Sequence, residues 1–472
     1  MATYQEIIGR LFDLQKFGMK FGLESMKSIL NRLGNPEKDQ RYIHLAGTNG
    51  KGSTAAMLAE ILKRSGYKTG LYTSPHLVTF RERIQINGRL ISENDVADLS
   101  AEVWEAINPK SPPTFFEFVT AMAFLYFKRQ AVDMAVIETG LGGRLDSTNV
   151  IIPLVSAITN IGLEHTEQLG PTISDIAYEK AGIIKPGALF VGGRLCKDAL
   201  AVIEKKLKDN NVSQALFLDR DYRAIETTKS ETKKSETHKN DAHQNQSANS
   251  PGASSLTLKH LTINYQSSRW AFDNIILNLS ATYQIDNAAM AIAIAESIDS
   301  LGVKIINQAV YEGLANTSWP GRAESFAPHS WPMDKSAKAP LLLDGAHNPA
   351  GAAALAEFLS VTSKKRLHLI LGVMADKDIG GVLGPILPLA DRLYLTRPTY
   401  SRAATPQMLL DKLTSCFGSP SCPTELYPTL PEAVAAAASL AEPEDLVLIS
   451  GSLFTVGEAR AHLMGIDSVE TN

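Results

Sequence analysis

The chain has 472 residues, of which 44% are hydrophobic and 20% are charged, and its formal net charge is −4. This length exceeds what one ordinary hydrophobic core supports, so we expect two or three domains. The composition is typical of a soluble globular protein. No run of lysine and arginine offers a surface for nucleic acid, which argues against a nucleic-acid-binding function.

The sequence shows neither the pattern of a signal peptide nor that of a disulfide framework. Cys196, Cys416 and Cys422 show no C-x-x-C spacing and indicate a reducing compartment. The first residues mix charged with apolar side chains and lack the pattern of a signal peptide. No apolar run approaches membrane-spanning length. We expect a cytoplasmic monomer that binds neither membrane nor nucleic acid.

Helical and extended patterns alternate through the first part of the chain. Helical spacing predicts one or two helices within 4–33, then a buried strand at 42–46 and a helix at 53–65. Further predicted elements are strands at 69–72, 133–138, 155–159 and 188–192, a hairpin within 81–90, and helices at 92–107, 116–127 and 175–182. Such alternation indicates a parallel sheet.

Residues 226–255 interrupt this pattern. They contain no Leu, Ile, Val, Met or aromatic residue. Such a segment cannot bury enough apolar surface to offset its conformational entropy, so we expect a disordered insertion. A regulatory or partner-binding segment is the alternative, although no residue in it favours one.

The second part of the chain returns to alternation. Strands are predicted within 256–279 and a helix at 285–301, and the Pro320-Gly321 pair is a natural hinge. A polar stretch at 328–338 is predicted to be a loop. A second series of strands, with helical stretches between them, begins at residues 341, 367, 391 and 445.

These patterns predict an α/β fold of two domains. We expect an N-terminal P-loop nucleotide-binding domain with a parallel sheet over residues 1–318 and a hinge at 319–322. A smaller C-terminal Rossmann-like α/β domain follows over residues 323–472. It contains no G-x-G-x-x-G, so the dinucleotide fingerprint is absent.

The stretch YIHLAGTNGKGST, residues 42–54, is the strongest chemical signal. Gly47, Gly50 and Gly52 permit a tight turn between the strand and the helix, with backbone amides facing inward. A strand, a Gly-rich turn, a lysine and a helix N-terminus together form an anion cradle. We expect Lys51 to reach the outer phosphates of a nucleotide.

The match to the P-loop pattern G-x-x-x-x-G-K-[ST] is imperfect. Leu45 stands at the position of the first glycine, and Gly52 separates Lys51 from Ser53. Ser53 or Thr54 would offer a hydroxyl to Mg²⁺. An ordinary Gly-rich turn is the alternative, but the combined pattern favours phosphate binding.

Several polar residues follow predicted strands, at the sheet edge where ligands bind. Glu138 ends an apolar strand, as the Mg²⁺-binding acid of a P-loop enzyme does, although a solvated acid fits equally. Taken alone, Ser74 reads as a cap or turn residue and His165 as structural, since Mg²⁺ prefers oxygen ligands. Arg144 follows a glycine-rich turn.

Three further polar residues lie at the predicted hinge and at the first strand end of the second domain. They are Arg322, Asp344 and His347. A surface salt bridge and hydrogen bonds within a turn explain them as well as ligand binding does.

Six motifs resemble, in order and approximate spacing, those of the folylpolyglutamate synthase and dihydrofolate synthase family within the Mur ligase superfamily. They are HLAGTNGKGST at His44, TSPHL at Thr73, IETGLGGRLDSTNV at Ile137, LEHTEQLG at Leu163 with EKAGIIKPG ending at Gly187, WPGRAE at Trp319, and DGAHNP at Asp344. The resemblance covers most of the chain except 226–255, the stretch near 328–338 and the last residues.

The resemblance implies ATP-dependent amide formation between a pterin-linked carboxylate and L-glutamate, through an acyl phosphate and with two Mg²⁺ ions. Lys51 and His165 would act in catalysis, with Ser74, Glu138 and His165 as metal ligands. The implied ATP contacts are Thr48, Asn49, Gly50, Lys51, Gly52, Ser53, Asn287, Arg322, Asp344 and His347.

The resemblance also implies a pterin pocket and a modified lysine. The implied pterin contacts are Phe21, Gly22, Thr114, Phe115, Phe116, Glu117, Leu145, Asp146 and Ser147. Phe115 and Phe116 suit stacking on a flat heterocycle, or core packing at a helix start. Lys180 matches a catalytic lysine that is carbamylated in the superfamily, although its spacing alone indicates a solvated helix lysine.

The expected substrates are ATP, L-glutamate, dihydropteroate, and tetrahydrofolate with its polyglutamates. Extension of folates alone is one alternative. A muropeptide ligase of the same superfamily is another, which the TSPHL and GLGGRLDSTN motifs oppose. A nucleotide-dependent regulator without turnover is a third, and the set Lys51, Glu138, His165, Arg322 and Asp344 argues against it.

Overall fold

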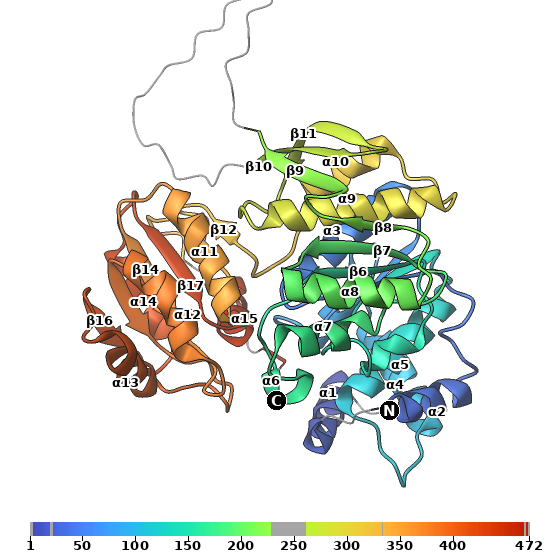
Figure 1. Ribbon diagram of the computed structural model, residues 1–472. Helices are drawn as coiled ribbons and strands as arrows, with labels where there is room; N and C mark the ends of the chain where they lie inside the picture. Colours follow the sequence, from blue (N-terminus) through green and yellow to red (C-terminus); the bar gives the residue numbers. More distant parts are fainter. Residues whose placement is uncertain (1–2, 19–21, 228–260, 333, 467–468, 471–472) are drawn as a thin grey trace, which may run out of the picture.

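The computed structural model describes residues 3–18, 22–227, 261–332, 334–466 and 469–470. The strands form three sheets arranged in two lobes (Figure 1). We call the part that contains strands β1–β11 the N-terminal lobe and the part that contains β12–β17 the C-terminal lobe.

The elements of the N-terminal lobe follow the predicted alternation. In chain order they are α1 (Tyr4–Phe12), η1 (Asp13–Phe17), α2 (Glu24–Arg32), β1 (Tyr42–Ala46), α3 (Lys51–Arg64), β2 (Thr69–Tyr72), η2 (Phe80–Arg83), β3 (Ile84–Ile86), β4 (Arg89–Leu90), α4 (Glu93–Ala106), α5 (Phe115–Arg129), β5 (Met134–Glu138), η3 (Ser147–Val150), β6 (Val155–Asn160), α6 (Thr166–Leu169), α7 (Ile173–Ala181), β7 (Leu189–Arg194), α8 (Lys197–Asp209), β8 (Ala215–Phe217), β9 (Tyr222–Glu226), β10 (Leu261–Ser267), β11 (Ala271–Leu277), α9 (Gln284–Ser300) and α10 (Asn307–Asn316).

The C-terminal lobe is built in the same way on a smaller scale. Its elements are β12 (Glu324–Phe326), β13 (Leu341–Leu343), α11 (Pro349–Val361), β14 (Leu367–Leu371), α12 (Ile379–Ile386), η4 (Leu387–Leu389), β15 (Arg392–Leu395), α13 (Pro406–Phe417), β16 (Thr424–Leu426), α14 (Leu430–Leu440), β17 (Leu446–Ser450) and α15 (Leu453–Met464).

The large sheet has eight strands in the order β4-β3-β2-β5-β1-β6-β7-β8. Strands β2, β5, β1, β6, β7 and β8 are parallel, and the β3–β4 hairpin adds an antiparallel edge. Strand β1 therefore lies between β5 and β6, and all five of its residues are buried. This central position brings the ends of β1, β2, β5 and β6 to one edge of the sheet.

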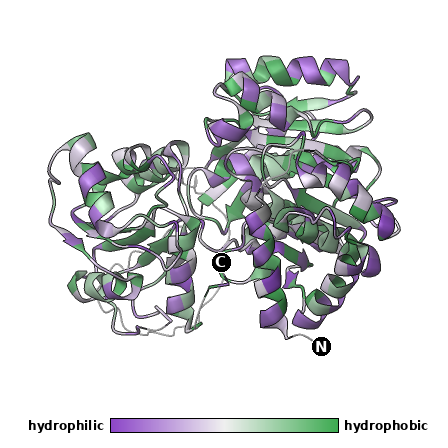
Figure 2. Cartoon of the chain, turned by 90° about the horizontal axis from the view of Figure 1, so that it is seen from below, coloured by the Kyte–Doolittle hydropathy of each residue, from purple (hydrophilic) through white to green (hydrophobic). Residues whose placement is uncertain are grey.

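Hydrophobic clusters cover both faces of this sheet. Helices α3, α9 and α10 and the small sheet β11-β10-β9 contribute to one cluster, and α1, α2, α4 and α5 contribute to another. Figure 2 shows hydrophobic strands inside each lobe and hydrophilic stretches on the outer helices. The parallel strands read as continuous apolar runs because both of their faces are covered.

The C-terminal sheet has six strands in the order β12-β13-β17-β14-β15-β16. Strand β12 pairs antiparallel with β13, and the remaining pairs are parallel. This is the predicted Rossmann-like α/β arrangement with one antiparallel edge strand. The fold class is confirmed.

Several predictions need correction at particular residues. The helix after the Gly-rich turn begins at Lys51 instead of residue 53. Glu226 ends strand β9 and pairs with Ile263, so the predicted insertion does not begin there; residues 228–255 lie outside the described residues. The described residues of 328–338 form a loop, as predicted, but Trp331 in this loop is fully buried and donates its indole N–H to the Ala339 carbonyl.

Among the described ranges, no helix combines the length and the apolar character that a membrane span needs.

Close contact between α3 and α10 fixes the helix that begins at the Gly-rich turn. A Cβ on Gly313 of α10 would lie 2.9 Å from the Cα of Ile61 and 3.0 Å from its backbone nitrogen. We predict that Gly313→Ala lowers the free energy of unfolding by about 1–2 kcal/mol, because overpacking against a backbone exceeds the gain in helix propensity. Denaturant unfolding measures this change.

Gly9→Ala in α1 is the matched control. A Cβ there would meet no atom within 4 Å, so only the helix propensity changes. That variant should gain up to about 1 kcal/mol. Equal stabilisation by both substitutions would contradict the close packing of α3 on α10.

Candidate functional site

The Gly-rich turn joins the end of β1 to the start of α3. Gly50 has a φ of +84° and occupies the N-cap position of α3, where no side chain caps the helix. A Cβ on Gly50 would also lie 2.3 Å from Oδ1 of Asn287, so both the backbone angle and the space require glycine. The first amides of α3 are therefore available to an anion.

Two lysine ammonium groups converge on this turn. Lys51 Nζ donates to the carbonyl oxygens of Gly47 at 3.1 Å and Thr48 at 3.3 Å. Lys180 Nζ, from α7, donates to the same Gly47 oxygen at 2.8 Å. The sequence pattern placed Lys180 on a solvated helix face, but the residue is only 5% exposed.

Burial changes the acid–base chemistry of Lys180. Loss of hydration lowers the pKa of its ammonium to about 7, and the charge of Lys51 acts in the same direction. Glu164 and Asp146 oppose this shift. Near neutral pH, Lys180 therefore carries a large fraction of free amine.

Glu138 lies at the end of β5, beside the turn. Its carboxylate is 3.8 Å from Lys51 Nζ, and it accepts a hydrogen bond from the Ser74 backbone N–H at 3.1 Å. Burial raises the pKa of Glu138, and Lys51, the Ser74 amide, Arg322 and Arg83 oppose the rise. The structure thus brings Lys51, Ser74 and Glu138 together.

Side chains from both lobes, one lysine and two histidines, surround the carboxylate of Glu164. Its Oε1 lies 3.4 Å from His347 Nε2, 3.4 Å from Lys377 Nζ and 4.0 Å from His165 Nε2. Burial alone would raise the pKa of Glu164, but the hydrogen bond from His347 and the charges of His347, Lys377 and His165 hold it well below its usual value. Sequence reasoning missed Glu164 and Lys377, although LEHTEQLG contains Glu164.

His165 itself adopts a left-handed backbone, with a φ of 52°, at the start of α6. Burial lowers the pKa of its imidazole, Glu164 raises it, and Lys377, Lys180 and Lys51 lower it further. The charges of Lys51 and Lys180 at the turn therefore affect the pKa of His165.

Further contacts join the turn to the C-terminal lobe. The side chains of Asn49 and Asn348 exchange hydrogen bonds of 2.9 and 3.2 Å. Asp344, at the end of β13, accepts from Tyr283 Oη at 2.5 Å and from the Ala323 backbone N–H at 2.9 Å. Asn348, which sequence reasoning missed, therefore joins the C-terminal lobe directly to the predicted Asn49 of the Gly-rich turn.

The remaining residues predicted to contact nucleotide lie around this junction. Arg322 donates to the Gly345 carbonyl at 3.2 Å, and His347 Nδ1 lies 2.8 Å from the same oxygen. Asn287 donates to Gln284 Oε1 at 2.8 Å, and Gln284 in turn donates to Ser53 Oγ at 3.4 Å. Gly52 lies in the first turn of α3, against the ring of Trp319.

The predicted pterin residues Thr114 to Glu117 form the start of α5. Thr114 and Glu117 form a reciprocal capping box, in which the Thr114 N–H donates to Glu117 Oε2 at 2.7 Å. The other oxygen of Glu117 is buried and has no partner among the described residues. Phe115 stacks on Phe12 in the core, whereas Phe116 is half-buried over Gly140.

Asp146 holds the turn after β5 together. Its Oδ2 accepts from the N–H groups of Gly140 and Leu141 at 2.9 and 2.8 Å, and its Oδ1 accepts from Thr148. Burial raises the pKa of Asp146, and these hydrogen bonds oppose the rise. Both carboxylate oxygens of Asp146 therefore have hydrogen-bond partners within the turn.

The other predicted pterin contacts divide between described and undescribed residues. Leu145 and Ser147 are half-buried beside Asp146, and Gly22 has a φ of +125°. Phe21 lies outside the described residues.

The side chains at this site could hold Mg²⁺ only together with a bound, phosphate-bearing substrate. No group of three or more His, Cys, Asp or Glu side chains in the described part of the chain is arranged to hold a metal ion alone. Glu138 and Ser74 lie together beside the anion cradle and supply oxygen donors. Phosphate oxygens would complete such a site, because Mg²⁺ is held by few carboxylates plus substrate phosphates.

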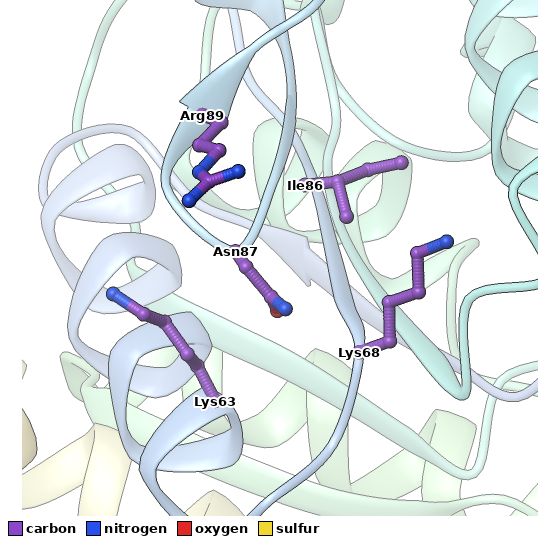
Figure 3. Close-up of a pocket in the computed structure, with 5 residues that line it drawn as sticks. All are labelled: Lys63, Lys68, Ile86, Asn87 and Arg89. Carbon is purple, nitrogen blue, oxygen red and sulfur yellow. The ribbon is translucent and has the colours of Figure 1, made fainter.

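A separate hollow of about 510 Å³ lies at the far end of α3, lined by Lys63, Lys68, Ile86, Asn87 and Arg89 (Figure 3). Lys63 is paired with Glu60, and Lys68 donates to the Gln130 carbonyl. The hollow contains neither a Gly-rich turn nor a carboxylate, so we assign no chemistry to it.

Comparison with known proteins fits this geometry. The Mur ligase middle domain matches residues 45–295, and the Mur ligase glutamate ligase domain matches residues 333–453. The architecture is that of a Mur-type ligase. The chain is 33% identical over 470 residues to the dihydrofolate synthase/folylpolyglutamate synthase of Bacillus subtilis, covering 98% of this chain and 99% of that one. The chain belongs to the folylpolyglutamate synthase and dihydrofolate synthase family.

A solved structure of the same family has a similar fold. Escherichia coli FolC in complex with DHPP and ADP is 27% identical, and the match covers 99% of each chain with a TM-score of 0.82. A Haloferax volcanii relative, named a probable bifunctional folylpolyglutamate synthase/dihydropteroate synthase, is 34% identical over 462 residues. The match covers 97% of this chain but 50% of that relative, so the chain spans about half its length.

Proposed function

We propose that the protein is an ATP-dependent ligase that joins L-glutamate to dihydropteroate, giving dihydrofolate, and to reduced folates, giving folylpoly-γ-glutamates. One observation carries the proposal: two lysines and the uncapped start of α3 face one Gly-rich turn, with Glu138 beside it. The family of the chain supports the substrate class. Extension of folates alone is the alternative.

The residues explain how a carboxylate becomes reactive. A carboxylate is a poor electrophile, so ATP converts it to an acyl phosphate, which the amine of glutamate then attacks. Lys51 and the first amides of α3 neutralise and hold the phosphates. Thr48, Asn49, Asn287, Arg322, Asp344 and His347 are the proposed further ATP contacts.

We assign Ser74, Glu138 and His165 as ligands of the Mg²⁺ ions that the reaction uses. Bound Mg²⁺ would neutralise charge on the transferring phosphoryl group. The oxygen donors of Ser74 and Glu138 beside the cradle support this assignment. The two lobes would enclose the acyl phosphate and limit its hydrolysis by water.

We place the pterin ring near Phe116 and Glu117. Half-buried Phe116 offers an aromatic face, and the free oxygen of Glu117 is a buried acceptor for ring N–H groups. Phe115 packs in the core instead.

The domain boundary is proposed at 319–322, between the end of α10 and the start of β12.

Lys180 is the proposed site of carbamylation. The neutral amine nitrogen would bond to the carbon of CO₂ and lose a proton, which turns a buried cation into an anion. We predict a ¹³C carbamate signal after incubation with labelled bicarbonate, growing as the pH rises through about 7, because the free amine grows over that range. NMR should show no such signal in Lys180→Arg, and an unchanged signal there would exclude Lys180.

We predict that Lys51→Ala lowers kcat/KM for ligation at least 100-fold, because phosphate charge is no longer neutralised. The fold should persist, since the Lys51 ammonium lies in the cradle and outside the hydrophobic clusters. Lys63→Ala, in the last turn of the same helix, is the matched control and should keep near-normal activity. Near-normal turnover of Lys51→Ala would refute the phosphate role.

The substrates are tested by product mass spectrometry with ATP, L-glutamate and either dihydropteroate, tetrahydrofolate or a muropeptide precursor. We expect dihydrofolate from the first and glutamate-extended folate from the second. Extension without dihydrofolate would limit the protein to the alternative activity. Reaction only with the muropeptide precursor would overturn the proposal.

A further inference from the structure

The loop after β2, residues 73–80, lies between the two lobes. Its Leu77 and Val78 are buried in a hydrophobic cluster formed mainly by residues of the C-terminal lobe. A Cβ on Gly457 of α15 would lie 2.2 Å from the Leu77 carbonyl oxygen, so the helix backbone touches the loop. The same loop begins at Thr73-Ser74, beside Glu138.

Glu470, which follows α15 in the sequence, binds the other side of this loop. Its backbone N–H donates to the Val78 carbonyl at 2.9 Å. Its own carbonyl lies 2.6 Å from His76 Nε2, which must be the donor because a carbonyl only accepts. His76 Nδ1 then accepts from Arg83 Nε at 2.8 Å. The backbone of Glu470 is therefore hydrogen-bonded to the loop twice, at the Val78 carbonyl and at the His76 imidazole.

The carboxylate of Glu470 adds three hydrogen bonds, all to Oε2. The donors are the Phe80 backbone N–H at 2.7 Å, Thr79 Oγ1 at 3.0 Å and Tyr4 Oη at 3.1 Å. Tyr4 comes from α1 of the N-terminal lobe. A residue beyond the C-terminal lobe therefore holds both the loop and the first helix.

A second carboxylate holds the same loop locally. Glu82 accepts from the backbone N–H groups of Leu77, Val78 and Thr79 at 2.6, 3.1 and 3.1 Å. Glu82 belongs to η2 and moves with the loop. Glu470 instead follows Val469, which packs against the apolar cluster of the C-terminal lobe, so its hydrogen bonds to the loop depend on where that lobe lies.

We propose that Glu470 is a positioning residue that fastens the 73–80 loop, and with it Ser74, to the C-terminal lobe. This inference rests on the proposed function, because it assigns Ser74 to the ligation site. Glu470 touches neither Lys51 nor Glu138 in the described structure and acts through the loop and through Tyr4 of α1.

Hydrogen exchange without substrates tests the fastening directly. Glu470→Ala should raise amide exchange across residues 76–80 about tenfold, because three hydrogen bonds to a carboxylate are lost. Glu470→Gln should restore most of the protection, since its amide oxygen accepts from the same donors. Glu357→Ala is the matched control: Glu357 is exposed, and its carboxylate has no hydrogen bond or ion pair with the described residues.

Kinetics then test the positioning role. Glu470→Ala should lower kcat/KM for the pterin substrate about tenfold, while the Kd for ATP measured without Mg²⁺ changes less than twofold, because the loop contributes neither Lys51 nor the first amides of α3. Glu470→Gln should recover kcat/KM. Tyr4→Phe, which removes one donor, should give a smaller effect of the same kind, and thermal unfolding confirms that each variant is folded.

Two results would overturn the proposal. One is exchange at 76–80 in Glu470→Ala equal to that in Glu357→Ala. The other is faster exchange with unchanged kcat/KM for the pterin substrate. Absence of ligation by the unaltered chain would instead overturn the proposed function, and the exchange measurement, which uses no substrate, would still decide the fastening.

Discussion

The site is built around one backbone oxygen that receives two ammonium groups. Lys51 and Lys180 both donate to the Gly47 carbonyl, beside the uncapped start of α3. Burial, and after it the positive charge of Lys51, lowers the pKa of Lys180 to about 7. Glu138 offsets only part of this charge at 3.8 Å. The arrangement is therefore suited to a highly charged anion, and the fold around it serves to hold that charge in place.

Chain topology explains why this charge lies at the junction of the lobes. The parallel strands β1, β5 and β6 deliver the Gly-rich turn, Glu138 and Asn160 to one edge of the large sheet. Strand β13 of the second sheet leads to Asp344 and Asn348, and Asn348 binds Asn49. In the proposed site each lobe supplies only part of the groups that would bind the ligand.

Local patterns predicted the elements well, because period and turn chemistry are local properties. Strand 42–46 and strand 69–72 were predicted with the observed bounds, and the Asn87-Gly88 hairpin was confirmed. The burial of Lys180 was not predictable, since its partner Gly47 is 133 positions away in sequence. Glu164, Lys377 and Glu470 were missed for the same reason: their roles arise from contacts between lobes. The stretch 328–338 is a loop, as predicted, but nothing in its polar composition indicates that Trp331 is buried.

Both polar and apolar contacts join the lobes. The Asn49–Asn348 pair, the contacts of Glu164 with His347 and Lys377, and the Tyr283–Asp344 hydrogen bond each contribute on the order of 1 kcal/mol, because folding exchanges bonds with water for bonds within the protein. The cluster around Leu77 and Val78 adds a buried apolar contact, and Ala281, which precedes α9, is buried among apolar residues of the C-terminal lobe. For the proposed ligation the lobes must admit glutamate and release a larger product, so some of these contacts would have to open and re-form in each cycle. In that cycle the proposed fastening of the 73–80 loop by Glu470 would decide how completely Ser74 returns to the site.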